Sequence, residues 1–341
     1  MNPKKFVVNV HQALYGDRPI VETLSLGITR GSIVAVVGEP GLSKSYLVLQ
    51  LAVGLASCMR VLGEFIQPPV RPLRIAYFNS EDSTVVLQQR LHDIWRTLAP
   101  SAFGVDEAAR EIAANNLQKN LVVQGWDGED CDLFKEEATA FDEAIHELVE
   151  LIDVLILDTF SDIFSGNENS TSDVRQFCNR LKRLAKKHQI AVVLVHHAGK
   201  GGGDGIYASR GSSVLPGKVR LQLNLSRVSD EDASRKAPGL DVKDLVWLSN
   251  TKSSYGLLSK QCLLRRDENG VLHAHKKGTS QTVRALGDPV ESLSSDQPVR
   301  PVSAKILDES PKPHAKVPRP DPITVAPAVM SALAGKELPN E

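Results

Sequence analysis

The stretch GEPGLSKS, Gly38–Ser45, lies between an apolar β-branched run at residues 32–37 and an apolar segment at residues 46–58. A strand, a glycine-bearing turn, a Lys-Ser pair and a helix, in that order, are typical of a phosphate-binding P-loop. Backbone N–H groups and the helix N-terminus present positive partial charge to one point there. Lys44 adds a full charge for the β- and γ-phosphates, and the Ser45 hydroxyl can bind Mg²⁺. The sequence therefore predicts an ATP site made by Gly38, Glu39, Pro40, Gly41, Leu42, Ser43, Lys44 and Ser45.

One position of this loop departs from the pattern G-x-x-x-x-G-K-[ST], because Ser43 occupies the place of the second glycine. Serine is small, but any side chain penalises a backbone conformation with positive φ. A generic turn between a strand and a helix is the alternative interpretation of this stretch. The motifs further along the chain favour the phosphate site, and we expect Ser43 to weaken nucleotide binding without abolishing it.

Length and composition narrow the class of protein. The 341 residues suffice for one large α/β domain or two ordinary ones. The net charge is −1, so any nucleic-acid binding must come from a local patch. The four cysteines form no C-x-x-C pair, which favours a reducing cytosol over a disulfide framework or a zinc site. No window approaches the ~18 apolar residues of a membrane helix, so we expect a cytoplasmic protein without membrane contact.

A candidate catalytic carboxylate, Glu81, follows a strand expected at residues 74–78. Ser83 can cap the helix that comes next, whose apolar residues recur at helical spacing up to Leu98. Ligands of a parallel sheet bind at the carboxyl ends of its strands, so Glu81 is expected beside the P-loop. There it can orient and deprotonate an attacking water. A helix N-terminal acid is the alternative role, and it suits Asp82 well.

A second carboxylate, Asp158, ends the wholly apolar run VLIL at residues 154–157, which is typical of a central parallel strand. An acid in this place behind a P-loop matches the Walker B pattern, in which the carboxylate holds Mg²⁺ directly or through water. We therefore expect Asp158 and Ser45 to share one Mg²⁺ ion. Any buried strand can end in aspartate, and that remains the alternative interpretation.

Two histidines, His196 and His197, follow the next core strand at residues 191–195. A histidine at this edge can donate a hydrogen bond to a γ-phosphate and so report its presence. Adjacent strand side chains point to opposite faces, which disfavours a metal pair and allows one of the two to be a buried core residue. The glycine-rich loop at residues 199–205 cannot form a stable element and is well placed to move with the nucleotide state.

The remaining chain supplies further strands and a tail. Residues 172–187 are expected to form a helix with a basic outer face, either solvated or in contact with a phosphate backbone or a neighbouring subunit. A polar turn at 216–218 precedes further strands, at 219–223, 245–249, 261–265 and 271–273.

Ten of the 19 prolines lie beyond Leu286. We therefore expect a folded domain at residues 1–275 and a disordered tail at 276–341. Within the tail, residues 325–333 are either a frayed chain end, which we favour, or a short helix that docks on a protein partner.

Taken together, these motifs resemble the RecA-like P-loop ATPases and, within them, the RepA-type hexameric replicative DNA helicases of plasmids and mobile elements. The resemblance spans residues 32–256 and rests on six motifs: GEPGLSKS, FNSED, VLILDTF, LVHHAGKG, ASRGSSVLPGKVRLQ and NTKSSYG. It implies an α/β fold with a mostly parallel central sheet flanked by helices. It also implies homo-hexameric rings that bind ATP between subunits and translocate on single-stranded DNA.

The resemblance also assigns roles to individual residues. It implies that Lys44 and Ser45 bind phosphate and Mg²⁺, and that an arginine finger acts on the neighbouring subunit's nucleotide. The catalytic set is then Lys44, Glu81 (base), Asp158 (Walker B), His197 (γ-phosphate sensor, with His196) and Arg220 (finger). The implied DNA contacts are Lys200, Arg210 and Lys252, of which Lys252 can alternatively assist hydrolysis in trans.

The leading functional prediction is an ATP-hydrolysing motor that depends on single-stranded DNA, a helicase in the replication or transfer of a mobile element. The alternative is a RecA-like ATPase that switches with nucleotide state and regulates a partner without unwinding DNA. A helicase requires a DNA-lined channel, and the sequence offers only a small basic loop for it.

Overall fold

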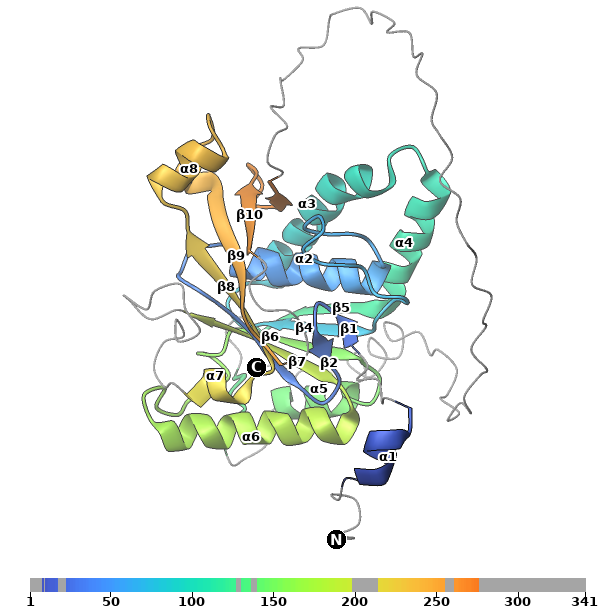
Figure 1. Ribbon diagram of the computed structural model, residues 1–341, viewed down its shortest axis with the longest axis vertical. Helices are drawn as coiled ribbons and strands as arrows, with labels where there is room; N and C mark the ends of the chain where they lie inside the picture. The colour runs from blue at the N-terminus through green and yellow to red at the C-terminus, as the bar shows by residue number, and fades with distance from the viewer. Residues whose placement is uncertain are drawn as a thin grey trace, which may run out of the picture. The chain divides into compact units, whose positions relative to one another are not determined.

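The computed structural model describes residues 8, 10–17, 23–126, 130–135, 140–197, 214–254 and 261–275. Its centre is a nine-stranded sheet in the order β11-β10-β9-β8-β3-β7-β6-β4-β5 (Figure 1). The strands are β3 (Ile33–Gly38), β4 (Ile75–Asn79), β5 (Leu121–Gly125), β6 (Val154–Asp158), β7 (Ala191–His197), β8 (Leu221–Arg227), β9 (Leu245–Ser253), β10 (Gln261–Arg266) and β11 (Leu272–Ala274). A separate short pair is formed by β1 (Thr23–Ser25) and β2 (Ile28–Thr29).

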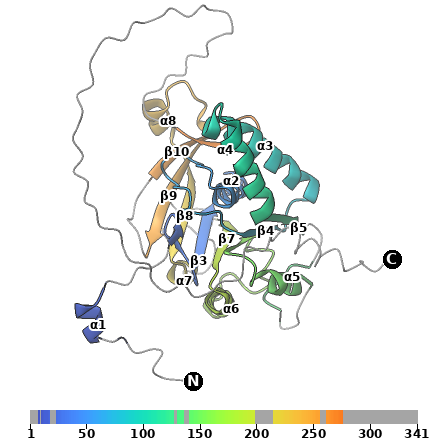
Figure 2. The ribbon, with the colours of Figure 1, turned by 90° about the vertical axis from the view of Figure 1, so that its right-hand side faces the viewer.

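Six neighbouring strands, from β5 to β8, are parallel, and β9, β10 and β11 continue the sheet in antiparallel order. Helices cover both faces, with α2, α3 and α4 on one and α5 and α6 on the other (Figure 2). The helices are α1 (Val10–Tyr15), α2 (Lys44–Ser57), α3 (Thr84–Phe103), α4 (Glu107–Asn120), α5 (Ala140–Leu148), α6 (Thr171–His188), α7 (Val214–Lys218) and α8 (Asp230–Lys236). Among the described residues, no helix is long and apolar enough to span a membrane.

The core explains why the central strands are apolar throughout. Strand β3 is buried on both faces. Its residues Val34 and Val36 belong to the cluster that packs on α2, whereas Ala35 and Val37 belong to the cluster beneath α5 and α6. This double burial fixes β3 between β7 and β8, so the loop that follows Gly38 starts from a rigid strand.

Two sequence expectations about elements differ from the structure. The apolar spacing of residues 134–151 predicts an amphipathic helix over this whole range, whereas helix α5 extends over Ala140–Leu148 and does not include Phe134. The carboxylate of Asp132 accepts hydrogen bonds from the backbone N–H groups of Phe134 and Ser165, at 2.8 and 3.2 Å, and holds Phe134 in a turn. The expected polar turn at residues 216–218 is instead the end of α7, where Pro216 lies in the first helical turn and loses no hydrogen bond. The tail at residues 276–341 lies outside the described residues.

The amino ends of the central strands are joined by a buried carboxylate, Asp153, which is fully shielded from solvent. It accepts hydrogen bonds from Arg30 at 2.6 Å, from Arg74 at 3.2 Å and from Arg71 at 3.3 Å. Burial alone would raise the pKa of Asp153, but the hydrogen bonds from Arg74, Arg30 and Arg71 outweigh it and hold the pKa well below the usual range.

Replacing this carboxylate, Asp153→Asn, should lower the free energy of unfolding at pH 7 by about 3 kcal/mol, because it removes the buried charge with which Arg30, Arg71 and Arg74 pair. These guanidinium groups are partly exposed, so water compensates part of the loss. The sign of the pH dependence follows from the depressed pKa. The carboxylate stabilises the fold at every pH above the unfolded-state pKa of about 3.9, and this contribution is lost as the pH falls through the lower folded pKa. Urea unfolding of both proteins at pH 7 and pH 3 measures the difference, which should be smaller at pH 3. Equal stability at pH 7 would contradict the assignment.

Candidate nucleotide-binding site

The P-loop connects β3 to α2 and has the conformation of a phosphate cradle. Gly41 has a φ of +79° and Ser43 a φ of +60°, so both lie in the left-handed region. The first glycine is fixed by packing, because a Cβ at Gly38 would lie 2.9 Å from the carbonyl oxygen of Leu225. The φ of Ser43 costs a non-glycine residue about 1–2 kcal/mol, as the sequence suggested.

An arginine that the sequence did not single out supports this strained serine. The Arg266 side chain, at the end of β10, donates to the carbonyl oxygen of Gly41 at 3.1 Å and to the Ser43 hydroxyl at 3.3 Å. It also donates to the carbonyl oxygen of Lys243 at 2.6 Å. On the other side of the loop, Arg227 pairs with the Glu39 carboxylate at 2.7 Å. Arginines at the ends of β8 and β10 therefore hold the P-loop in place.

Space for a ligand adjoins these contacts. A cavity of about 520 Å³ is bordered by the P-loop residues Gly41 and Leu42 and by Arg227, Lys243 and Arg266. Leu42 itself is buried in the core, whereas Pro40 is exposed. Among the P-loop residues of the prediction, Leu42 thus contributes packing, and the backbone around Gly41 faces the open space.

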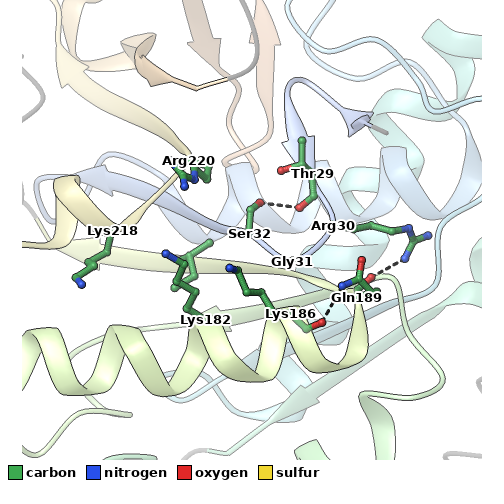
Figure 3. A pocket seen from close by; sticks show the side chains of 10 residues that line it. Thr29, Arg30, Gly31, Ser32, Lys182, Lys186, Gln189, Lys218 and Arg220 are labelled. Atoms are coloured by element: carbon green, nitrogen blue, oxygen red, sulfur yellow. Dashed lines mark hydrogen bonds between the residues drawn. The ribbon is translucent and has the colours of Figure 1, made fainter. Parts of the chain in front are cut away.

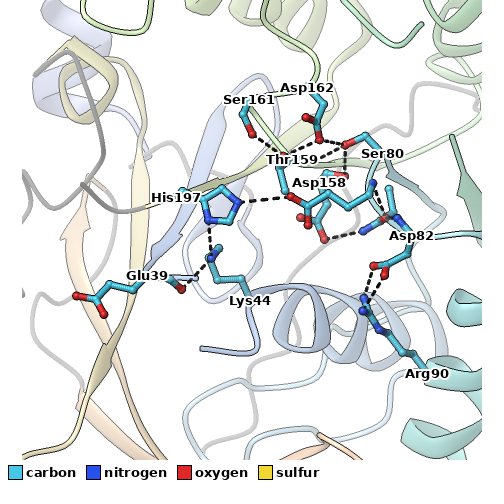
Figure 4. A network of polar contacts seen from close by, with 12 residues as sticks. Glu39, Lys44, Ser80, Asp82, Arg90, Asp158, Thr159, Ser161, Asp162 and His197 are labelled. Carbon is cyan, nitrogen blue, oxygen red and sulfur yellow. Dashed lines mark hydrogen bonds and ion pairs between the residues drawn. The ribbon is translucent and has the colours of Figure 1, made fainter. Parts of the chain in front are cut away.

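The P-loop lysine is already engaged with two other predicted residues (Figure 4). Lys44 is buried, and its Nζ donates to the carbonyl oxygen of Glu39 at 3.0 Å and to Nδ1 of His197 at 3.1 Å. An ammonium group can only donate, so we assign Nδ1 as the acceptor and place the ring proton on Nε2. That nitrogen lies 3.5 Å from Oε1 of Glu81.

The electrostatics of this chain of contacts follow from burial and from the neighbouring charges. Burial lowers the pKa of Lys44, and the negative charges of Asp158 and Glu81 oppose the shift. The hydrogen bond from His197 lowers the pKa of Glu81 against the effect of burial, and the positive charges of Lys44 and Arg90 add to it. Glu81 is therefore held as a carboxylate, the form that can accept a proton.

Asp158, the predicted Walker B acid, lies at the same edge and is 1% exposed. Its Oδ2 accepts hydrogen bonds from the Tyr77 hydroxyl at 2.7 Å and from Nδ2 of Asn79 at 3.1 Å. Burial raises the pKa of Asp158, and the hydroxyls of Tyr77 and Ser45 act against that rise. Within the described part of the chain, the buried Oδ1 has no hydrogen-bond partner at normal geometry. A free carboxylate oxygen close to the Ser45 hydroxyl fits the hard oxygen ligands that Mg²⁺ prefers.

Asn79, which the sequence did not single out, joins the two carboxylates. It is fully buried at the end of β4, and its Oδ1 accepts from the backbone N–H groups of Glu81 at 3.0 Å and Asp82 at 2.6 Å. Its Nδ2 donates to Asp158 and, at 3.2 Å, to the Tyr77 hydroxyl. One amide group therefore fixes the turn that carries Glu81 relative to Asp158.

We expect Asn79→Leu to lower kcat for ATP by about 10²-fold with a much smaller change in KM, because a misplaced catalytic group costs this much. Asn79→Asp keeps both acceptor bonds to the backbone but sets a charge against Asp158, and should be similarly impaired. Steady-state kinetics with thermal melting as a folding check make the measurement. Asn115→Leu, at an exposed position of α4, is the control. A normal kcat in a folded Asn79→Leu protein would contradict this role.

The other predicted site residues lie elsewhere. His196 is buried with its ring 4.5 Å from that of Phe160, on the opposite face of β7 from His197. The backbone N–H of Arg220 donates to the carbonyl oxygen of Ile33, so Arg220 lies at the amino end of β3, away from the P-loop of its own chain. Lys252 lies near that end too, and its ammonium group donates to the carbonyl oxygen of Pro216. Lys200 and Arg210 lie outside the described residues.

Comparison of the sequence with known protein families identifies the family of this chain. The sequence model of the AAA domain matches residues 10–203, more than half of the chain. This chain belongs to the AAA domain family. The chain is similar to the solved structure of the ATPase domain of G40P, with a TM-score of 0.51 and 12% sequence identity. The similarity covers 79% of this chain and 97% of that one. The likeness confirms the predicted fold, a mostly parallel central sheet flanked by helices.

Two curated relatives of this AAA domain protein are both described as DNA repair protein RadA. The relative from Synechocystis sp. is 27% identical over 199 residues, which cover 57% of this chain and 34% of the relative. The relative from Streptococcus pneumoniae is 25% identical over 201 residues, which cover 57% of this chain and 37% of the relative. The matched region thus amounts to roughly a third of the length of these relatives.

Proposed function

We propose that this AAA domain protein hydrolyses ATP with Mg²⁺ and that it does so between the subunits of a homo-oligomer. The observation that carries the proposal is the chain of contacts from Lys44 through His197 to Glu81, beside a buried Walker B acid. These four side chains come from four different segments and meet at one edge of the sheet. A purely structural role would not require a lysine, a histidine and two carboxylates at the mouth of a P-loop.

In this proposal each side chain has a defined task. Ser45 and the free Oδ1 of Asp158 hold Mg²⁺, which neutralises charge on the β- and γ-phosphates when it is bound. Glu81 accepts a proton from the attacking water. Lys44 moves from His197 to the phosphates, and His197 then offers its Nε2 proton either to the γ-phosphate or to Glu81. His197 thereby couples the presence of the γ-phosphate to the position of the base.

The rate-enhancing arginine comes from a second copy in this scheme. Arg220 lies at the end of β3 opposite to the P-loop, so it is suited to a neighbour's nucleotide and not to its own. Lys252 lies close enough to Arg220 for the arginine's charge to add to burial in lowering the lysine's pKa, and assists there. A hexameric ring of the RepA type, as the sequence motifs imply, is the assembly that we propose.

We propose further that the energy of hydrolysis drives movement on single-stranded DNA, as in a helicase for the replication or transfer of a mobile element. The support is the set of sequence motifs together with relatives that are described as DNA repair proteins. Lys200, Arg210 and Lys252 are the proposed DNA contacts, and the cytoplasm is the proposed location.

ATP turnover with and without single-stranded DNA, measured together with the native mass in the presence of ATP, tests this function. We expect a ring whose turnover rises when single-stranded DNA is added, and no comparable rise with duplex DNA. The Lys44→Ala protein serves as the control that measures background turnover by contaminating ATPases. A monomer whose hydrolysis ignores DNA would contradict the motor and would favour the nucleotide-dependent regulator.

A further inference from the structure

A second concave site, which we call the amino-edge pocket, lies at the end of the sheet opposite to the P-loop. It has a volume of about 390 Å³ and is formed where β3 and β8 begin, above α6 (Figure 3). Five cationic side chains line it: Arg30, Lys182, Lys186, Lys218 and Arg220. At roughly 3.3 Å per residue, the six residues of β3 place it about 17 Å from the protein's own phosphate cradle.

Four of the five cations that line this pocket have no acidic partner among the described residues. Of the described residues that line it, none is acidic. Arg30 does pair with Asp153, but that carboxylate is shared with Arg71 and Arg74. Lys218 donates to the neutral amide oxygen of Asn179 at 3.1 Å. For Lys182, Lys186 and Arg220, the described residues provide no ion pair.

These cations also share one space. Lys182 and Lys186 are four residues apart on α6 and therefore lie on the same face of the helix. Burial lowers the pKa of Lys182, and the charges of Lys186, Arg220 and Lys218 lower it further, as expected for ammonium and guanidinium groups that face a common cavity. Like charges held together in this way destabilise the empty pocket and favour an anion in it.

We propose that the amino-edge pocket binds the phosphate groups of a di- or triphosphate. Guanidinium groups bind phosphate oxygens in a bidentate manner, and ammonium groups bind them as point charges. The volume exceeds that of one phosphate group and lies within the range of small-molecule sites. The phosphates belong either to a nucleotide held by the P-loop of a second copy or to a free anion such as pyrophosphate. Binding itself does not depend on hydrolysis, whereas the first source rests on the proposed function.

Calorimetric titration of pyrophosphate into the full-length Lys44→Ala protein, whose P-loop is disabled, tests the site. We expect saturable binding that Lys182→Gln with Lys186→Gln weakens by about tenfold or more. The matched control is Arg183→Gln with Lys187→Gln, which removes the same charge from the same helix outside the pocket. It should change the affinity by no more than about twofold, because exposed charges are screened. In the wild-type protein, two pyrophosphate sites are expected, of which the Lys182/Lys186 pair removes one.

No saturable binding to a folded Lys44→Ala protein, or an equal loss in both pairs of variants, would overturn the proposal. A mixture of Lys44→Ala chains with Lys182→Gln/Lys186→Gln chains then identifies the source. Turnover that is lost in the Lys182→Gln/Lys186→Gln protein alone and recovered in the mixture assigns the pocket to a second copy's nucleotide. Undiminished turnover by the Lys182→Gln/Lys186→Gln protein alone assigns it to a free anion. Absence of turnover in the wild-type protein would count against the proposed function alone, since the titration does not require hydrolysis.

Discussion

Arg220→Ala is expected to lower the ATP turnover of the assembled protein by about 10³- to 10⁵-fold and to leave ATP binding intact, as the loss of an arginine finger does. The reason is positional. Arg220 is exposed and lies away from the Lys44–His197–Glu81 contacts of its own chain. Its removal should therefore spare the nucleotide site and remove only the charge that a neighbour supplies. Turnover and nucleotide affinity, measured on the same preparation, separate the two effects.

A mixing experiment decides whether Arg220 acts in trans. Arg220→Ala chains keep a complete P-loop and base, whereas Glu81→Gln chains keep the arginine. If the two meet at one interface, part of the activity should return on mixing, although each variant is inactive alone. Arg235→Ala, which removes an exposed arginine of α8, is the control and should leave turnover unchanged. A mixture that stays inactive would argue against the finger.

Lys44→Ala should abolish ATP turnover, because it removes both the charge for the phosphates and the donor that holds His197. Nucleotide affinity should fall as well, since the lysine contacts the β- and γ-phosphates before hydrolysis. Lys119→Ala, an exposed lysine at the end of α4, is the matched control. Thermal melting shows whether the variant is folded. Undiminished hydrolysis by a folded Lys44→Ala protein would refute the P-loop assignment.

The part of the site that sequence could predict is the part that topology alone brings together. Lys44, Glu81, Asp158 and His197 each follow or end a core strand. Because the strands concerned are parallel, their carboxyl ends meet at one edge, so recognising the strands was enough to group the residues. The positive φ of Ser43 follows from the P-loop motif, which has a glycine at this position.

The residues that sequence missed act through side-chain direction, which strand order does not determine. In the sequence, Asn79 is simply the last residue of a strand. Only the orientation of its side chain shows that its amide group bonds both to Asp158 and to the backbone of Glu81. Arg266 is 223 residues away from Ser43 in the chain, and no local pattern links them. The amino-edge pocket combines residues that precede β3 and β8 with one face of α6, which the sequence could describe only as basic.

The placement of the P-loop and Arg220 at opposite ends of β3 has a consequence for assembly. If Arg220 completes a neighbour's site, each chain carries half of one site at one end and half of another at the other end, so the interface is heterologous. Such an interface generates closed rings or open filaments, and an isolated two-fold dimer cannot form from it. In an open filament, the terminal subunit would bind ATP without hydrolysing it. The mean turnover per chain would then rise with filament length and become constant once the ring closes.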